Sequence, residues 1–302
     1  MFRKILVPLD GSPLGEHALP FALGIAKACG AQVHIALVHV PEAYSDYEAP
    51  GAEDLGIEAK SREQAYLEAL ARRLGGMPKG IIHVHHLEGI PQETLAAEVV
   101  QREIDLVVMN VHGWGYLSRA ITGSVSDYLM RHLAVPMLVM HARDSSTDLT
   151  RDSAIKSILI CLDGSELAET IIRPAVALGS LWNARFDLVR VASLAGPLAA
   201  GGGEEAQATR RHLLDKASKD ATAYLKGVAQ RIGQAGSSTQ IHAPVHANTA
   251  AAILETAKTT ACDAIAVATH GRGGLSRLLL GSVADKVMRG ADCPVLVYRP
   301  PH

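Results

Sequence analysis

The sequence contains the same series of segments twice, in the same order. KILVPLDGS at residues 4–12 returns as SILICLDGS at 157–165, and DLVVMNVHG at 105–113 returns as DAIAVATHG at 263–271. Two further pairs keep this order: VHIALVHV (33–40) with FDLVRV (186–191), and VPMLVM (135–140) with CPVLVY (293–298). Because the order holds over all 302 residues, the pattern indicates that a whole domain has been duplicated. We expect one domain at residues 1–142, a polar linker at 143–153 and a second domain at 154–302.

Within each half, short apolar runs alternate with longer amphipathic stretches. The first half has five strand candidates, most of them nearly continuous in Val, Ile and Leu, at residues 4–9, 33–40, 80–88, 105–110 and 136–140. Such runs are typical of strands that are buried on both faces of a parallel sheet. Helical spacing is found at residues 16–30, 60–74, 91–103, from 124 onward, and near 167–181, 209–232 and 249–260. We therefore predict an α/β fold of two tandem doubly wound domains, each with a five-stranded, mainly parallel sheet flanked by helices.

Composition limits the partners of such a chain. The net charge is −2, so no basic field attracts nucleic acid or an anionic membrane. No apolar run is long enough to cross a bilayer, and the four cysteines lie far apart without a CxxC pair. We expect a cytoplasmic protein with reduced thiols and with neither nucleic-acid nor membrane partners.

Polar residues and glycines follow the predicted strands. In an open parallel sheet, ligands bind beyond the carboxyl ends of the strands, where strand order reverses. Asp10 and Asp163 end the first strand of each half, and Val40 and Val191 end the second. The fourth strands lead into HGWGYLSRAITGS (112–124) and HGRGGLSRLLLGS (270–282), which match at eight of thirteen positions.

These two stretches have the arrangement of an anion-binding loop. Each has a glycine after a strand and ends with Gly-Ser before an expected helix, for which Ser124 or Ser282 is the expected N-cap. A helix start offers free backbone N–H groups, and a glycine lets a phosphate approach the backbone closely. The simpler interpretation is that the serines cap helices and the glycines form turns. Neither a P-loop nor a complete dinucleotide fingerprint is present.

The chain resembles the universal stress protein family, and its halves look like a tandem pair of such proteins. The resemblance rests on the matching strands and on G-x9-G-S, present as Gly113…Gly123-Ser124 and as Gly271…Gly281-Ser282. ATP-binding members of the family carry G-x2-G-x9-G-[ST] in a Rossmann-like, adenine nucleotide alpha hydrolase-like domain. The resemblance therefore implies an ATP ligand, with Mg²⁺ as a possible companion, and a role in stress response or signalling.

The resemblance also implies which residues contact the nucleotide. In the second half these are Asp163, Val191, Ala268, Gly271, Arg272, Gly281, Ser282 and Val283. In the first half they are Asp10, Val40, Gly113, Gly123, Ser124 and Val125. The aspartate would contact the ribose or adenine, the valine backbone the adenine edge, and the glycine–serine segment the phosphates.

The first glycine of the family motif is absent from both halves. Its positions hold Asn110 and Ala268. Alanine adds one methyl group, which a backbone of negative φ accommodates. Asn110 adds an amide, and the bulky Trp114 follows it closely. We therefore favour the second half as the nucleotide site.

The sequence contains no convincing catalytic set. GxSxG, HExxH and compact carboxylate pairs are absent, and we expect His112 and His270 to fix their loops by hydrogen bonds. The main prediction is a nucleotide-binding module rather than a dedicated enzyme. Two alternatives stay open. One is a nucleotide-free scaffold or dimerisation protein, and the other is a slow ATPase, or a protein that phosphorylates itself on Ser124 or Ser282.

Histidines gather in one predicted strand of the first half. His83 and His85 would share a strand face, which suits metal ligation, and His86 follows them. His242 and His246 occupy the equivalent place in the second half. We expect these histidines to be surface residues of an edge strand and assign no metal ligand, with metal binding as the alternative.

The last strand of each half is apolar, and exposed apolar edges favour strand pairing. In universal stress proteins these strands commonly pair across a two-fold axis. The resemblance therefore implies pseudo-two-fold pairing of the two halves within one chain, and it leaves a homodimer possible.

Overall fold

The computed structural model of the chain divides into two compact units, Met1–Ala154 and Ile155–His302, which are described here one at a time. The described residues are 2–41, 52–76, 78, 80–111, 124–141, 147–151, 153–193, 204–233, 237–269 and 281–301.

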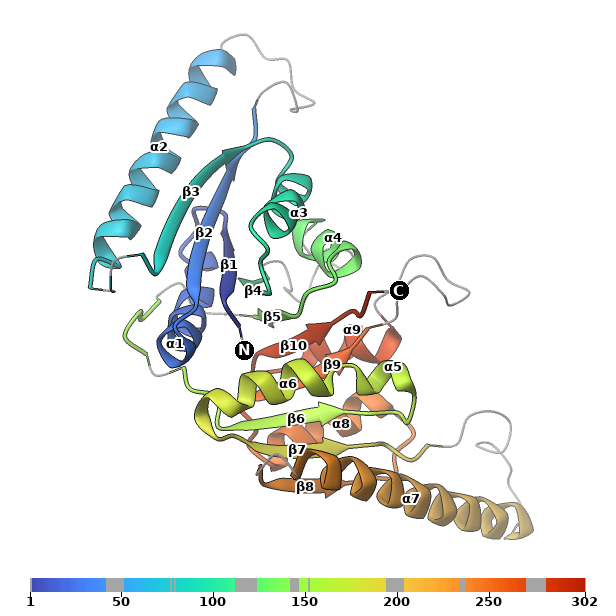
Figure 1. The fold of residues 1–302 in the computed structure, drawn as a ribbon. Helices are drawn as coiled ribbons and strands as arrows, with labels where there is room; N and C mark the ends of the chain where they lie inside the picture. The colour runs from blue at the N-terminus through green and yellow to red at the C-terminus, as the bar shows by residue number, and fades with distance from the viewer. Residues whose placement is uncertain are drawn as a thin grey trace. The chain divides into compact units, whose positions relative to one another are not determined.

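The first unit alternates strands and helices along the chain (Figure 1). Its elements are β1 (Lys4–Leu9), a 3₁₀ turn η1 (Gly15–Ala18), α1 (Leu19–Cys29), β2 (Gln32–His39), α2 (Ala52–Arg73), β3 (Ile82–Glu88), α3 (Pro91–Gln101), β4 (Leu106–Asn110), α4 (Ser124–His132) and β5 (Met137–Met140). Each apolar run of the sequence forms a strand, and each stretch with helical spacing forms a helix. The predicted α/β fold is confirmed for this half.

The strands of the first unit are parallel, in the order β3-β2-β1-β4-β5. The pairing of β1 with β2 runs from Lys4 opposite Gln32 to Leu9 opposite Leu37. β1 and β4 are neighbours although β2 and β3 separate them in the sequence, so strand order reverses between them. This switch point makes the carboxyl ends of β1 and β4 the expected position for a ligand.

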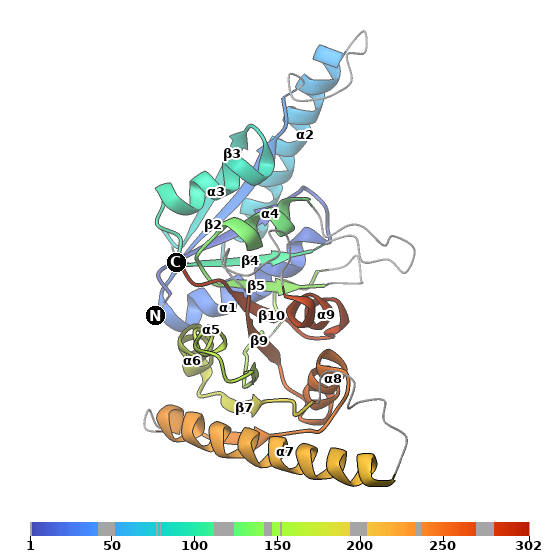
Figure 2. The same ribbon diagram turned by 90° about the vertical axis from the view of Figure 1, so that its right-hand side faces the viewer.

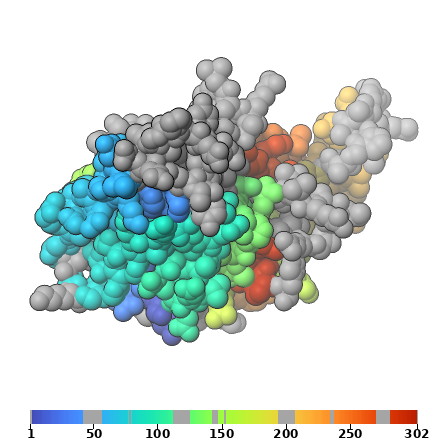
Figure 3. Space-filling view, turned by 90° about the horizontal axis from the view of Figure 1, so that it is seen from above, coloured from blue at the N-terminus to red at the C-terminus, as the bar shows by residue number. Residues whose placement is uncertain are grey.

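Helices cover both faces of this sheet because its strands are apolar on both sides. α1 and α2 pack against one face, and α3 and α4 against the other (Figure 1). Ile5, Leu6, Ile35 and Leu106 are fully buried between these layers. On the outside of the unit, α2 and the segment from β3 to α3 lie next to each other (Figure 3).

The second unit repeats this arrangement. Its elements are β6 (Ser157–Cys161), α5 (Glu166–Glu169), α6 (Ile172–Gly179), a 3₁₀ turn η3 (Ser180–Trp182), β7 (Arg185–Val189), α7 (Glu204–Gly233), β8 (Thr239–His242), α8 (Thr249–Thr259), β9 (Ala264–Ala268), α9 (Ser282–Gly290) and β10 (Val295–Tyr298). Its strands are parallel in the order β8-β7-β6-β9-β10, which places the switch point between β6 and β9. Figure 2 shows α8 and α9 side by side.

The single helix predicted near residues 167–181 is divided into α5, α6 and η3. Pro174 explains the division between α5 and α6. Its nitrogen carries no hydrogen to donate to the Thr170 carbonyl, and its ring would clash with that carbonyl in a continuous helix. Proline is tolerated in the first turn of a helix, which is where Pro174 lies in α6.

Backbone pairing fixes which residues of the two units correspond. Gln32 N–H donates to the Arg3 carbonyl at 2.8 Å, and Arg185 N–H donates to the Lys156 carbonyl at 2.9 Å. Each bond is made by the first residue of its strand, so Gln32 of β2 corresponds to Arg185 of β7. The two strands can then be compared residue by residue from these positions onward.

The correspondence corrects one of the sequence matches. Counted along the two strands, Val191 corresponds to Val38, and Val40 corresponds to Ser193. The match of Val40 with Val191 was therefore wrong by two residues. A shift of two keeps every side chain of a strand on the same face, so the apolar pattern alone cannot distinguish the two alignments.

Candidate functional site

An aspartate follows the first strand of each unit. Asp10 and Asp163 are exposed beyond the carboxyl ends of β1 and β6, beside the switch points. Each carboxylate accepts a hydrogen bond from the backbone N–H two residues later, at 3.0 Å from Ser12 and at 2.8 Å from Ser165. The glycine between them has φ of 78° in the first unit and 93° in the second, which a glycine adopts without strain. The two aspartates thus occupy the same turn in each unit.

The residues in place of the family's first glycine differ in what they contact. Asn110, the last residue of β4, is buried, and its amide donates a 2.8 Å hydrogen bond to the carbonyl of Leu14, in the loop after β1. This side chain therefore crosses the switch point of the first unit. The same position in the second unit holds Ala268, the last residue of β9, whose methyl group makes no such bond.

The next residue adds a polar group to the second unit only. Thr269 follows Ala268, where Val111 follows Asn110 in the first unit. The Thr269 hydroxyl is buried and has no hydrogen-bond partner within the part of the chain that the structure describes. A buried hydroxyl left unpaired costs about 1–3 kcal/mol, so a polar ligand that bonded to it would relieve that cost.

The helix after the second glycine-rich loop begins differently from the prediction. Gly281 is its N-cap residue and α9 begins at Ser282, so the expectation that Ser282 is the N-cap was wrong. In the first full turn of α9, the Asp285 carboxylate accepts bonds from Arg289 Nε at 3.0 and 3.1 Å. A glycine N-cap has no side chain to occupy the first backbone N–H groups of the helix, which suits an anion site.

In the first unit, α4 likewise begins at Ser124, and Asp127 pairs with Arg131 at 2.8 Å. Val125 and Val283 are the second residues of α4 and α9. The other predicted loop residues lie outside the described ranges: Gly113, Gly123, Gly271 and Arg272, together with His112, Trp114 and His270.

Arg190 was not identified from the sequence. It corresponds to Leu37 of the first unit and lies over the Asp163 turn, since a Cβ atom on Gly164 would come within 2.9 Å of the guanidinium carbon. The same carbon lies 4.9 Å from the ring centroid of Tyr224. Arg190 thus holds a positive charge at the carboxyl edge of the second unit. The available signal was a cation between two valines in FDLVRV.

The predicted histidines of β3 divide between the two faces of the sheet. His83 and His85 stack on His34 of β2, with ring centroids 4.9 and 5.3 Å apart. His34 Nδ1 lies 3.1 Å from His85 Nε2. Burial, followed by the charges of His83 and His85, lowers the pKa of His34 to about 4, and burial also lowers the pKa of His85. β3 is the edge strand of its half-sheet, as expected, and these three rings form a partly buried stack on one of its faces.

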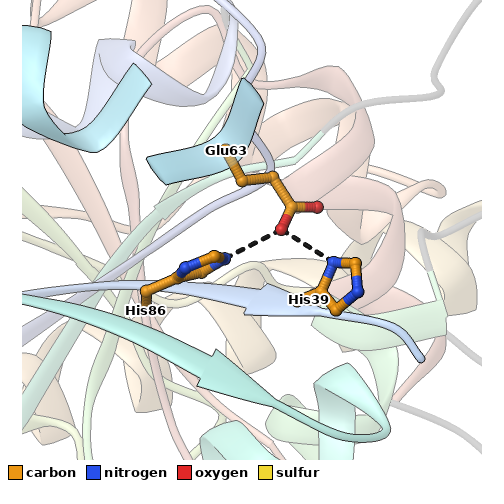
Figure 4. Close-up of side chains that lie close together, drawn as sticks. All are labelled: His39, Glu63 and His86. Atoms are coloured by element: carbon orange, nitrogen blue, oxygen red, sulfur yellow. Dashed lines mark hydrogen bonds and ion pairs between the residues drawn. The ribbon is translucent and has the colours of Figure 1, made fainter. Parts of the chain in front are cut away.

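His86 lies on the opposite face, where it meets His39 of β2 and Glu63 of α2 (Figure 4). Glu63 Oε2 lies 2.9 Å from His39 Nδ1 and 2.8 Å from His86 Nε2. The ligand atoms of these three residues all lie within 4.8 Å of one another, an arrangement that could hold a metal ion. His39 and Glu63 were missed because sequence separations of 24 and 23 residues form no recognisable motif.

The histidines of the second unit have other partners. His242 Nε2 lies 2.8 Å from Asp187 Oδ1, and Arg185 Nε donates to the same fully buried carboxylate at 2.9 Å. His246 Nδ1 accepts a 2.8 Å hydrogen bond from the backbone N–H of Asn248. Of the two histidines at the place equivalent to the β3 histidines, the half-buried His242 therefore pairs with a buried carboxylate, and the exposed His246 lies in a turn.

Comparison with known proteins identifies the family. The sequence profile of the universal stress protein family matches residues 1–141 and 154–299, which make up nearly the whole chain. The chain belongs to the universal stress protein family. This universal stress protein carries the family domain twice.

Its curated relatives cover different shares of the chain. A universal stress protein of Mycolicibacterium smegmatis is 30% identical over 216 residues, or 70% of this chain and 68% of the relative. One from Mycobacterium tuberculosis is 28% identical over 203 residues, and that match spans 63% of its length, less than two thirds. Another from the same organism is 26% identical over 314 residues, or 98% of this chain and 95% of the relative.

A solved structure shares the fold along the full length. The crystal structure of a universal stress protein from Archaeoglobus fulgidus aligns with 99% of this chain and 98% of its own, with a TM-score of 0.71 and 19% identity. At that identity the likeness concerns the fold alone. In the described part of this universal stress protein, no helix has the length and apolar character that crossing a membrane requires.

Proposed function

We propose that the second unit binds an adenine nucleotide, ATP with Mg²⁺, and that the protein acts as a nucleotide-responsive module in stress response or signalling. The observation that carries the proposal is the difference at the switch points. In the first unit the Asn110 amide crosses this position and bonds to Leu14, whereas in the second unit Ala268 leaves it without such a side chain.

Other features of the second unit also support nucleotide binding in this half of the chain. Asp163 is exposed beyond β6, where it can accept hydrogen bonds from ribose hydroxyls. Thr269 offers a buried hydroxyl, and Arg190 adds a positive charge at the same edge. The glycine N-cap of α9 leaves the first N–H groups of Ser282 and Val283 open to phosphate oxygens. Each of these groups suits one part of a nucleoside polyphosphate.

The first test is the nucleotide content of the purified protein. Freshly purified full chain would be heat-denatured and its supernatant analysed by chromatography and mass spectrometry, beside a titration of the nucleotide-free protein with ATP and Mg²⁺. We expect close to one adenine nucleotide per chain or one saturable site. The absence of both would contradict the proposal.

A matched pair of variants locates the site. Gly281→Val places a branched side chain at the start of α9 and should weaken ATP binding by more than about tenfold, which is about 1.4 kcal/mol. Gly123→Val makes the same change in the first half and should leave binding unchanged. Ala268→Asn should also weaken binding, because it introduces the amide found in the first unit. Loss in Gly123→Val alone would move the site to the first half.

A nucleotide-free scaffold is the second candidate, because β5 and β10 are apolar strands at one edge of their own half-sheets. Under that function the two halves pair within the chain, or two chains pair with each other. Light scattering after size-exclusion chromatography, with and without ATP, separates the candidates. A dimer that is independent of ATP, in a protein without bound nucleotide, would favour the scaffold.

Slow hydrolysis can be measured in the same preparation. Ser282 is exposed at the first position of α9. Turnover or autophosphorylation that is abolished in Ser282→Ala, with ATP binding retained, would add a catalytic role to the binding function. Binding without turnover is the result that the proposed module predicts.

A further inference from the structure

We propose that His39, Glu63 and His86 form a Zn²⁺ site in the first unit. The three residues come from β2, α2 and β3, and they converge on one point beside the carboxyl edge of the sheet (Figure 4). This site is separate from the proposed nucleotide site, which lies in the other unit, and does not depend on it.

The donor set suits zinc. Two imidazole nitrogens and one carboxylate oxygen are the protein ligands of many zinc sites that keep a fourth position for water. In tetrahedral coordination with bonds of about 2.0–2.1 Å, neighbouring ligand atoms lie roughly 3.3 Å apart. In this structure Glu63 Oε2 lies 2.9 and 2.8 Å from the two imidazole nitrogens. Small side-chain rotations would therefore open the cluster around an ion.

The groups are held in place before any ion binds. The side chain of His39 is 9% exposed, that of His86 19% and that of Glu63 26%. Both imidazoles face one carboxylate oxygen, so their ring orientations are fixed by hydrogen bonds. An ion would take the place of the two ring protons that face Glu63, and each neutral imidazole would then carry its proton on the other nitrogen.

The duplicated unit supplies an internal comparison for the two histidines. Gly89 N–H donates to the His39 carbonyl at 3.0 Å, and His246 N–H donates to the Ala192 carbonyl at 3.1 Å, so Ala192 corresponds to His39. His39 lies opposite Glu88, and Ala192 lies opposite Val245. His86 stands two residues before Glu88, and Ala243 stands two residues before Val245, so Ala243 corresponds to His86.

The corresponding helix lacks the third ligand as well. Tyr66 and Arg73 of α2 both bond to Glu16, and Tyr224 and Arg231 of α7 both bond to Glu169, so the two helices align on these residues. Three residues before the tyrosine stands Glu63 in α2 and Ala221 in α7. The same framework thus carries His, Glu and His in one unit and three alanines in the other. Packing of the helix on the sheet therefore does not require these polar groups, and a ligand accounts for them.

The ion would join α2 to the two outer strands. Lys60, one turn before Glu63, already pairs with Glu88 of β3 at 2.8 Å, but both side chains are about half exposed and such a pair contributes about 1 kcal/mol or less. A bound metal stabilises the folded unit according to its concentration relative to its dissociation constant, so Zn²⁺ should raise the melting temperature.

The experiment uses the full chain, stripped of metal by a chelator and dialysed. Zn²⁺ would be titrated in competition with a chromophoric chelator, and Co²⁺ would be used as a spectroscopic probe. We expect one Zn²⁺ per chain and a tetrahedral Co²⁺ spectrum without sulfur-to-metal charge transfer, which excludes the cysteines as ligands. No saturable Zn²⁺ binding, or a Co²⁺ spectrum with that charge-transfer band, would overturn the proposal.

Variants decide which residues bind the ion. The triple variant His39→Ala, Glu63→Ala, His86→Ala copies the residues of the second unit and should lose Zn²⁺ binding and the rise in melting temperature. The isosteric Glu63→Gln should weaken Zn²⁺ binding by more than about 100-fold. That is more than the loss expected when the changed residue only holds a ligand in place and does not bind the ion itself. His83→Ala, on the same strand but outside the cluster, should bind as the unmodified protein does. Undiminished binding in folded Glu63→Gln, or in the folded triple variant, would show that the cluster is only a hydrogen-bonded contact.

Discussion

Single side chains give the two halves different electrostatics on the same backbone. His34 of β2 corresponds to Asp187 of β7, and His85 of β3 to His242 of β8. The first unit therefore has a neutral imidazole pair where the second has a buried carboxylate bonded to an imidazole and to Arg185. A buried acid requires such partners, whereas a buried histidine can remain neutral instead.

His34 makes the stability of the first unit sensitive to pH. Burial, His83, His85, Arg102 and Lys4 all lower its pKa from 6.5 to about 4. Above pH 6.5 the ring is neutral in the folded and unfolded chains. As the pH falls from 6.5 towards 4, the unfolded chain takes up a proton that the folded chain does not, so the free energy of unfolding decreases. The shift corresponds to at most about 3 kcal/mol, and solvent screening reduces it to about 1–2 kcal/mol.

The measurement is urea unfolding of the unmodified protein and of His34→Gln at pH 7.5 and pH 4.5. The variant should lose less stability between these values, by about 1–2 kcal/mol. His132→Gln, on the exposed side of α4, serves as the control. Equal pH dependence in the unmodified protein and His34→Gln would show that His34 takes up its proton without cost to the fold.

At the scale of elements, both long helices are fixed by the same carboxylate clasp, defined as Glu16 with Tyr66 and Arg73, and as Glu169 with Tyr224 and Arg231. Each glutamate lies in the segment after the first strand of its unit, and each tyrosine and arginine lie two turns apart on α2 or α7. Glu16 is 5% exposed, so its carboxylate is shielded from water, whereas the Arg73 side chain that pairs with it is about half exposed. The clasp therefore positions α2 and α7 relative to the switch points.

Removing one hydroxyl from the clasp should destabilise only the unit that contains it. Tyr66→Phe deletes the 3.0 Å bond to Glu16 and should cost about 1–2 kcal/mol, because hydrogen bonds to charged groups contribute about 1.5–3 kcal/mol and Arg73 still pairs with the acid. Tyr224→Phe should act similarly in the second unit. Urea unfolding followed by hydrogen exchange assigns each loss to a unit. Gln64→Ala, on the exposed face of α2, is the control, and a loss of equal size there would contradict the clasp.

At the scale of the molecule, duplication has produced two units with the same frame and different chemical groups. The first carries the histidine–glutamate cluster and an amide across its switch point. The second carries alanines at the cluster positions and a small residue at its switch point. Each copy can thus serve a different ligand while the frame stays intact, because the strands and helices that form the frame do not depend on these groups.

The two proposed ligands should therefore protect different halves. In hydrogen–deuterium exchange, ATP with Mg²⁺ should slow exchange within residues 155–302, and Zn²⁺ should slow it in β2, α2 and β3. At a ligand concentration 100 times the dissociation constant, each should stabilise its unit by about 2.7 kcal/mol. Protection of the first unit by ATP, or of the second by Zn²⁺, would contradict this division. The two ligands are added separately, so either proposal can fail without the other.

The family, the presence of two domains and the class of fold could all be predicted from the sequence alone. These depend on local patterns: apolar runs such as KILVPL become buried strands, and stretches with helical spacing become helical, although Pro174 divides the one near residues 167–181. Asp10 and Asp163 could be placed at strand ends for the same reason. The period of two along a strand also explains why Val191 was matched with Val40 instead of Val38. Two residues apart, both valines share one face of an extended chain, so the pattern of faces fits either match.

The contacts between side chains that are distant in the sequence could not be predicted and became known from the folded structure. His39, Glu63 and His86 converge because of the register in which β2 pairs with β3 and the position at which α2 packs on these strands. Neither the register nor the packing position is encoded in a local run of residues. The contact between Asn110 and Leu14 spans 96 residues and depends on the reversal of strand order between β1 and β4. Such contacts arise from register and packing between distant segments, and for that reason the chemistry of the two halves became distinguishable only in three dimensions.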